Sequence, residues 1–191
     1  MNPWHEYLQS STEVLNELKA KLDPARVEDA VAAITTALAA NKPLLVCGNG
    51  GSATDSMHIA GELVGRFLKE RRALNVIALA ADPAFITAWS NDVGYDDIFA
   101  RQVEAYGAPG GVLLGISTSG NSKNVIAAIT MAAGKGMRTI GMTGHAGGSL
   151  GPLVDILLDV PSRSTPLIQQ AHICLYHFIC AEVEERIAAG Q

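Results

Sequence analysis

Cysteine is scarce in this chain of 191 residues, which contains only Cys47, Cys174 and Cys180. An odd number of cysteines without a C-x-x-C pair argues against a disulfide framework. Reduced thiols fit the cytoplasm better than an oxidising compartment. The first ten residues also lack the basic region and the apolar core of a signal peptide. We therefore expect a cytoplasmic protein.

Long apolar runs and basic clusters are also missing. No apolar run approaches the ~20 residues that cross a bilayer, so we expect no membrane association. Lys and Arg number 14 against 19 Asp and Glu, which gives a net charge of −5 and no basic patch for nucleic acid. The chain is instead 48% hydrophobic and only 17% charged, which is typical of a well-buried α/β protein. Its length suits one domain with a sizeable core.

The first informative stretch is an apolar run, 44–47, that stops at the sequence Gly-Asn-Gly-Gly-Ser over 48–52. A strand, a glycine-rich turn and a helix point backbone N–H groups and the positive end of the helix at an anion. The spacing matches neither the Walker motif nor the dinucleotide-binding motif. The following helix carries Asp55, His58 and Glu62 on one face. The stretch indicates chemistry on a phosphorylated small molecule, although an ordinary strand-to-helix turn has the same pattern.

A second loop of this kind follows the apolar run 112–116. It reads Ser-Thr-Ser-Gly-Asn-Ser over 117–122 and precedes a helical pattern. Hydroxyls and backbone amides can bind a phosphate without a cation, but they can also simply cap a helix. In an open parallel sheet, loops after the strands gather at the carboxyl ends, where ligands bind. The two loops together therefore predict a phosphate site.

The hydrophobic periodicity predicts alternating helices and strands along the whole chain. A turn at 70–72 is expected to be charged and solvated. The two helices before the first strand are expected both to pack on the sheet and to support self-association. The expected helices are 4–21, 24–40, 51–69, 83–90, 96–106, 123–135 and 165–188, and the expected strands are 44–47, 75–80, 112–116, 139–142 and 154–160.

The last expected helix carries His172 and His177, either of which could join His58 and Glu62 as a metal ligand or acid–base group. Periodicity alone does not choose between them, and a histidine satisfied in a core or interface is the simpler interpretation of either one. His145, in a glycine-rich loop, is expected on the surface.

Four segments together resemble a known family: CGNGGSATDSMHIAGEL, WSNDVGYDDIF, GISTSGNSKNVI and TPLIQQAHICLYH. They are similar to sugar isomerase (SIS) domains and, among these, to phosphoheptose isomerases, which act on sedoheptulose 7-phosphate. The resemblance implies a three-layer α/β/α fold with a five-stranded parallel sheet. It implies a single SIS domain over 1–191, in which helices within 1–40 pack at the oligomer interface and 41–191 form the α/β core. It also implies a homotetramer with active sites at the subunit contacts.

The activity that the resemblance implies is conversion of sedoheptulose 7-phosphate to D-glycero-D-manno-heptose 7-phosphate through an enediol, an early step of heptose synthesis for lipopolysaccharide or other cell-surface glycans. One zinc ion per subunit would be held by His58, Glu62, Gln169 and His177. Glu62 and His177 would be the catalytic base and acid, although a carboxylate bound to zinc is a poorer base. The implied substrate contacts are Asn49, Gly50, Gly51, Ser52, Glu62, Asn91, Asp92, Ser117, Thr118, Ser119, Ser122 and Gln169.

The sequence departs from the family pattern near the last motif. Leu167 stands where many members have an arginine, and Gln170 stands where an acidic residue is common, so an arginine contribution to phosphate binding or subunit pairing is not expected from this position. Two other functions remain open: a regulatory SIS protein that binds sugar phosphates or a replication initiator, and an isomerase of another phosphosugar. The pair of Glu62 and His177 argues against the first, since a pure adaptor needs no acid and base.

Overall fold

The sheet forms the middle layer of the molecule. The computed structural model describes residues 2–190, and its five strands are all parallel, in the order β2-β1-β3-β4-β5. β1 and β3 are buried along their whole length, as expected for strands that are covered on both faces. The predicted five-stranded parallel sheet is confirmed. The strands are β1 (Leu44–Gly48), β2 (Val76–Ala78), β3 (Val112–Ser117), β4 (Arg138–Thr143) and β5 (Ile156–Asp159).

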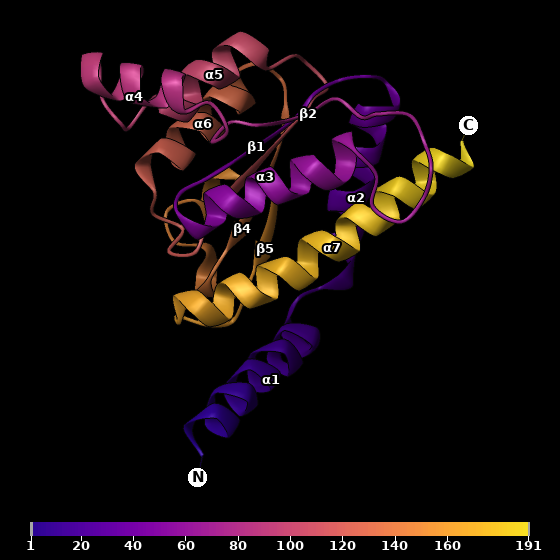
Figure 1. Cartoon of the computed structure of the whole chain (residues 1–191), viewed down its shortest axis with the longest axis vertical. Helices are drawn as coiled ribbons and strands as arrows, with labels where there is room; N and C mark the ends of the chain where they lie inside the picture. The colour runs from indigo at the N-terminus through magenta and orange to yellow at the C-terminus, as the bar shows by residue number, and fades with distance from the viewer. Residues whose placement is uncertain (1, 191) are drawn as a thin grey trace.

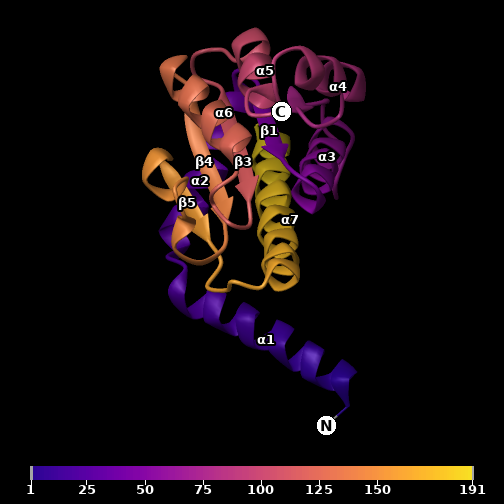
Figure 2. The same cartoon turned by 90° about the vertical axis from the view of Figure 1, so that its left-hand side faces the viewer.

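Helices cover both faces of the sheet (Figures 1 and 2). Side chains alternate along each strand, so Leu44 and Val46 enter one core while Leu45 and Cys47 enter the other. Helices α2, α3 and α7 close the first core, and α4, α5 and α6 pack on the second. Among the described residues, no helix is both long enough and apolar enough to cross a membrane. The helices are α1 (Pro3–Lys21), α2 (Pro24–Ala39), α3 (Gly51–Val64), α4 (Pro83–Asp92), α5 (Ile98–Tyr106), α6 (Lys123–Gly134) and α7 (Thr165–Ala189).

The two N-terminal helices have different surroundings. α2 buries Val31, Ile34 and Leu38 against the sheet, whereas Leu18 is the only buried residue of α1. α1 projects away from the body of the molecule (Figures 1 and 2). Packing on the sheet, expected of both helices, is therefore a property of α2, and α1 keeps a largely exposed surface.

The predicted end of the third helix is wrong. The sequence pattern continues to about residue 69, but α3 ends at Val64, and the chain then runs irregularly to β2. The reason lies in α7, where the Glu184 carboxylate accepts hydrogen bonds of 2.6–2.9 Å from the backbone N–H groups of residues 67–69. A side chain distant in sequence thus satisfies backbone donors that would otherwise continue the helix.

The prediction that residues 70–72 are solvated is also wrong for the central residue, Arg71. The Arg71 side chain is fully buried and pairs with Glu184 at 3.2 Å, although its flanking residues Glu70 and Arg72 are exposed. Arg71 also donates to the carbonyl oxygens of Glu62 (2.8 Å) and Gly65 (2.6 Å) at the end of α3. This buried pair, which we call the Arg71–Glu184 clamp, fixes the segment 65–72 against α7.

The strand order places the two glycine- and hydroxyl-rich loops side by side. β1 has β2 on one side and β3 on the other, so the chain changes direction across the sheet between β1 and β3. The registers pair Gly48 at the end of β1 with Ile116 near the end of β3. Loops that leave such neighbouring strands in opposite directions open a crevice at the carboxyl edge of the sheet.

Candidate active site

A pocket of about 310 Å³ occupies this crevice. The turn after β1 forms one wall, the hydroxyl-rich loop after β3 forms another, and the first turns of α7 close it. Most of the lining residues are glycines or carry a hydroxyl or amide group, and such residues can bind a phosphate. The lining residues are Asn49, Gly50, Gly51, Ser52, Ile116, Ser117, Thr118, Ser122, Thr165 and Gln169.

Two glycines are required by the shape of this pocket. Gly50 precedes α3 with φ of +55°, a backbone conformation that other residues rarely adopt. A Cβ atom at Gly51 would overlap the carboxamide of Gln169 from α7. The absence of a side chain at residue 51 therefore lets the Gln169 carboxamide lie against the first turn of α3, and a larger residue there would displace it.

The two loops are joined by a pair of asparagines. Asn49 donates to Asn124 (2.8 Å), Asn124 donates back (2.9 Å), and the hydroxyl of Tyr95 donates to the same Asn49 oxygen (2.9 Å). Asn124 lies in the first turn of α6 and is buried. The Asn49 side chain, expected to contact substrate, is thus largely occupied in holding one loop against the other.

The hydroxyl groups of the second loop do more than cap α6. Ser122 is the N-cap residue, but its side chain caps no backbone N–H and lies instead 2.9 Å from the Ser117 hydroxyl. Ser119 is exposed, and its hydroxyl accepts a hydrogen bond from the backbone of Asn121 (3.1 Å). Ser117 and Ser122 therefore face the pocket together, whereas Ser119 is not among its lining residues.

Asn91 and Asp92 lie apart from this pocket. They end α4, are exposed, and are joined by a hydrogen bond of 2.9 Å from the Asn91 amide to the Asp92 carboxylate. Their part in substrate binding remains a prediction.

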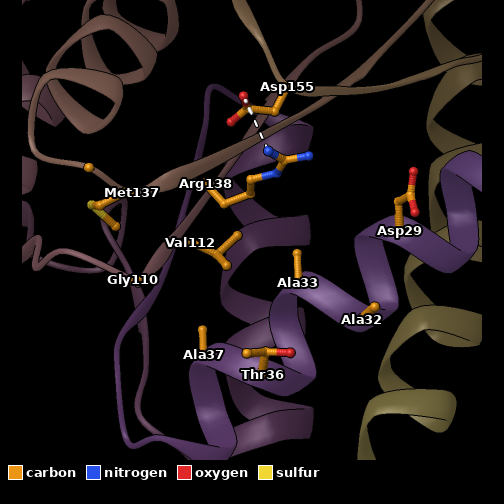
Figure 3. A pocket seen from close by; sticks show the side chains of 12 residues that line it. Asp29, Ala32, Ala33, Thr36, Ala37, Gly110, Val112, Met137, Arg138 and Asp155 are labelled. Atoms are coloured by element: carbon orange, nitrogen blue, oxygen red, sulfur yellow. Dashed lines mark ion pairs between the residues drawn. The ribbon is translucent and has the colours of Figure 1, made fainter.

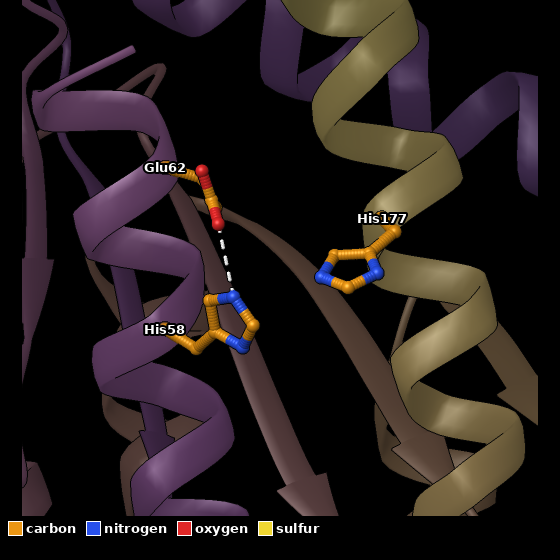
Figure 4. Close-up of side chains that lie close together, drawn as sticks. All are labelled: His58, Glu62 and His177. Atoms are coloured by element: carbon orange, nitrogen blue, oxygen red, sulfur yellow. Dashed lines mark hydrogen bonds and ion pairs between the residues drawn. The ribbon is translucent and has the colours of Figure 1, made fainter. Parts of the chain in front are cut away.

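A second group of predicted residues does come together. His58 and Glu62 on α3 face His177 on α7, and each of the three offers a ligand atom within 4.8 Å of the others (Figure 4). His58 Nε2 lies 2.9 Å from Glu62 Oε1. The side chains of His58 and Glu62 are 46% and 21% exposed, so the cluster is open to a ligand.

His172 has a different environment from His177 and does not lie with His58 and Glu62. It is fully buried, and its Nε2 atom lies 3.1 Å from the Thr143 carbonyl oxygen. Burial lowers its pKa from 6.5 to about 4, so the ring is neutral near pH 7. His172 belongs to the core between α7 and β4, whereas His145 is exposed, as expected.

Aromatic residues from distant segments support the cluster. Phe67 stacks on His177 with ring centroids 5.5 Å apart, and the Tyr176 hydroxyl lies 2.9 Å from Nδ1 of His58. Sequence reasoning missed both residues, together with Tyr95, Asn124 and Glu184. Each acts through contacts between segments distant in the sequence, which no local pattern indicates.

The cluster has the donors of a catalytic metal site. Two imidazoles and a carboxylate with an open side are a ligand set that zinc uses when a fourth position is left for water or substrate. The predicted fourth ligand, Gln169, lies with its amide against Gly51 in the loop pocket. A metal role for Gln169 therefore remains a prediction, while its place beside the loops is a feature of this structure.

A wider hollow of about 650 Å³ lies at the opposite edge of the sheet, beside α2 and the amino ends of β3 and β4 (Figure 3). Small side chains such as Ala33 and Ala37 form much of its wall, and Arg138 and Asp155 pair across it at 3.7 Å. It holds neither of the predicted loops and no member of the histidine cluster, so we assign it no catalytic role.

Comparisons with known proteins agree with this geometry. A family model described as "SIS domain" matches residues 6–144. The phosphoheptose isomerase of Citrifermentans bemidjiense is 49% identical over 180 residues, which cover 94% of this chain and 93% of that protein. The solved structure of the phosphoheptose isomerase of Neisseria gonorrhoeae matches with a TM-score of 0.89 and 37% sequence identity, and the match covers 95% of this chain and 96% of that one. The solved structure from Francisella tularensis matches with a TM-score of 0.90 and 36% identity, over the same shares of the two chains. The chain belongs to the phosphoheptose isomerase family of SIS-domain proteins.

Proposed function

We propose that this protein is an aldose–ketose isomerase that converts sedoheptulose 7-phosphate to D-glycero-D-manno-heptose 7-phosphate. The observation that carries the proposal is that the same two helices, α3 and α7, line the loop pocket and also bear the cluster of His58, Glu62 and His177. The relatives named above are phosphoheptose isomerases, which supports this substrate.

The spacing along these helices suits a long phosphosugar. From Gly51 to His58 and from Gln169 to His177, the helical rise amounts to about 10–12 Å. An extended seven-carbon sugar phosphate has a comparable length. The hydroxyl groups of Ser117 and Ser122 would bind the phosphate, and the reacting end would then lie at the histidine cluster, where binding of the far end fixes its position.

The chemistry requires proton transfer between adjacent carbons. Glu62 would remove a proton from C1 of the ketose, while His177 donates a proton to the carbonyl oxygen on C2. The resulting enediol becomes the aldose when a proton is delivered to C2 and the hydroxyl on C1 loses its own proton. In the reverse direction the two residues exchange these roles.

We further propose that His58, Glu62 and His177, with Gln169 as an additional ligand, hold one zinc ion per subunit. Bound there, the metal would polarise the carbonyl oxygen of the substrate. The donor types support zinc, and the three residues present ligand atoms to one another within 4.8 Å. Glu62 and His177 each have two proposed roles. The base function would require the Glu62 carboxylate to have an oxygen free of the metal, and the acid function would require the proton to come from the His177 ring nitrogen that is free of the metal.

The proposed setting is a cytoplasmic homotetramer that supplies heptose for lipopolysaccharide or other cell-surface glycans. The three free cysteines support the compartment. The exposed cluster and the largely exposed α1 support assembly, because neighbouring subunits would cover both.

A regulatory sugar-phosphate-binding protein or an initiator-associated SIS protein is not favoured, since binding alone gives no reason to join two histidines and a carboxylate. An isomerase of another phosphosugar remains the closer competitor.

The decisive experiment incubates the purified protein with sedoheptulose 7-phosphate and follows the aldose product, with and without a chelator, beside fructose 6-phosphate as an alternative ketose. We expect turnover of the heptulose, inhibition by the chelator and recovery on adding zinc. Turnover of the hexulose alone would contradict the proposed substrate, and chelator-resistant turnover would contradict the metal.

A further inference from the structure

Tyr176 is a buried tyrosine whose hydroxyl touches the histidine cluster. It is 1% exposed, and its oxygen lies 2.9 Å from Nδ1 of His58. The two rings meet edge to face, with centroids 5.4 Å apart and an angle of 72°. The other nitrogen of the His58 ring, Nε2, faces Glu62. His58 is thus held from both sides by polar groups with different properties.

Asp55 lies behind this contact, about one turn before His58 on α3. It is 8% exposed, and its Oδ2 atom is buried without a hydrogen-bond partner among the described residues. Burial raises the pKa of Asp55, and this effect is opposed by the nearby His58 ring and by hydrogen bonding to the Tyr176 hydroxyl. A buried carboxylate, a buried hydroxyl and an imidazole therefore lie in sequence.

The position of the ring proton depends on whether a metal is bound. Without one, Nε2 of His58 faces the Glu62 carboxylate, which can only accept, so the ring proton lies on Nε2 and the Tyr176 hydroxyl can donate to Nδ1. A metal ion on Nε2 would leave the ring proton on Nδ1, where the Tyr176 oxygen can accept it while its own proton turns toward Asp55.

We propose that Tyr176, backed by Asp55, is a positioning residue that accepts the Nδ1 proton of the His58 ring when the metal is bound, and so holds Nε2 directed at the metal. The inference rests on the proposed metal centre. A metal-binding histidine commonly donates its other N–H to an acceptor, and loss of that acceptor typically weakens metal affinity by roughly 10–100-fold. Here the acceptor is a tyrosine hydroxyl that relays the charge of a buried carboxylate.

Tyr176→Phe tests the inference, because it removes one oxygen and keeps the ring that packs against His58 and His177. Zinc affinity of the full-length protein is measured by competition with a chromogenic chelator. We expect a loss of roughly 10–100-fold. Asp55→Asn keeps an acceptor oxygen for the hydroxyl but removes the charge, so we expect a smaller loss.

Tyr95→Phe is the matched control for zinc binding. It also deletes a hydroxyl hydrogen bond of 2.9 Å, but that bond is made to Asn49 in the loop pocket. Its zinc affinity should equal that of the wild type. A second measurement needs no variant: ¹⁵N-histidine NMR of the zinc-loaded protein at pH 8 should show the proton of His58 on Nδ1.

The outcomes distinguish the inference from the proposed function. Zinc binding by the wild type with unchanged affinity in a folded Tyr176→Phe variant overturns the inference and leaves the metal centre intact. A His58 ring whose Nδ1 carries no proton in the zinc-loaded wild type overturns it even if the variant does not fold. A wild type that binds no zinc overturns both the inference and the metal part of the proposed function.

Discussion

At the scale of single residues, the two histidines of α7 show how two positions five residues apart on one helix have different environments. His172 points into the core and is fully buried, whereas His177 contacts Phe67 and lies in the cluster with His58 and Glu62. Both lie among apolar residues of the sequence, His172 between Ala171 and Ile173 and His177 between Tyr176 and Phe178. Only the packing of α7 on α3 and β4 distinguishes them.

This separation predicts the kinetics of three variants. Glu62→Gln keeps the size of the side chain but cannot accept a proton, and His177→Gln removes the proposed acid. General acid–base groups contribute about 10²–10⁴-fold, so each variant should lose at least ~100-fold in turnover at saturating substrate while remaining folded. His172→Gln should retain near-normal turnover per folded molecule. An inactive but folded His172→Gln beside an active His177→Gln would contradict the assignment.

His172 also predicts how stability depends on pH. Its pKa is about 4 in the folded protein because the ring is buried, and 6.5 is its ordinary value. Between these values the unfolded chain binds more protons than the folded one, so the free energy of unfolding should fall as the pH falls from about 6.5 to 4. The loss from this one group is on the order of 3 kcal/mol, and it stops below pH 4, where both states are protonated.

Urea denaturation of the wild type and His172→Gln at several pH values between 4 and 7.5 measures this effect. The difference between the two curves isolates His172 from carboxyl groups that titrate in the same range. We expect a shallower decline for the variant, and parallel curves would exclude His172 as a source of the pH dependence.

At the scale of elements, the sequence predicted the strands and most helices because local signals were strong. Apolar runs between glycine-rich turns gave β1 and β3, and Pro24 after Asp23 marked the start of α2, where the Asp23 side chain caps Ala25. The end of α3 could not be predicted in this way. The groups that end it, Arg71 and Glu184, are charged residues that the local pattern assigns to the surface, and they are buried only because α7 returns beside α3.

The candidate site likewise has a part that local sequence signals predict and a part that depends on long-range contacts. The glycine turn and the hydroxyl loop were predictable because each is a local motif after a strand, and the parallel order of the sheet brings them together. Asn49 and Asn124 are 75 positions apart in the sequence, and His58 and Tyr176 are 118 positions apart. No local sequence pattern therefore predicts these two contacts. Long-range side-chain pairs are therefore the part of the site that only the structure supplies.

The Arg71–Glu184 clamp predicts a large effect from one charge. The pKa of Glu184 is lowered: burial alone would raise it, but three backbone N–H groups and Arg71 outweigh that effect. Glu184→Gln keeps the shape and leaves the Arg71 charge buried without its partner. Breaking a buried pair in this way costs about 3–5 kcal/mol, so we expect a clear fall in Tm and in the free energy of unfolding.

Glu185→Gln is the control for the clamp. This neighbouring carboxylate pairs with Lys69, but both side chains are about half exposed. An exposed ion pair contributes roughly 0–1 kcal/mol, so the control should unfold almost like the wild type. Equal stability of the two variants would show that the clamp contributes no more than an exposed pair.

At the scale of the whole molecule, the exposed apolar side chains of α1 are not covered by any other part of the chain that the structure describes. Trp4, Tyr7 and Leu8 are 60%, 41% and 43% exposed, and α1 is held to α7 in part by a hydrogen bond of 2.8 Å from Gln170 to Tyr7. A mainly apolar hollow of about 680 Å³ is lined by residues of α1, α2 and α7, including Leu15 and Phe178. Exposed apolar surface on this scale commonly marks an interface.

Deletion of residues 1–22 tests whether this surface joins the subunits. In the proposed tetramer, the apolar side chains of α1 are buried against neighbouring chains, so their loss should give smaller species or aggregates in analytical ultracentrifugation. Phe178→Ser is the milder variant, because it changes the wall of the hollow and leaves α1 in place, and it should weaken assembly in the same direction. Tyr106→Ser removes a similarly exposed aromatic ring on α5, in the opposite helical layer, and should leave assembly unchanged. A truncated chain that still sediments as a stable tetramer would show that the subunits meet through other surfaces.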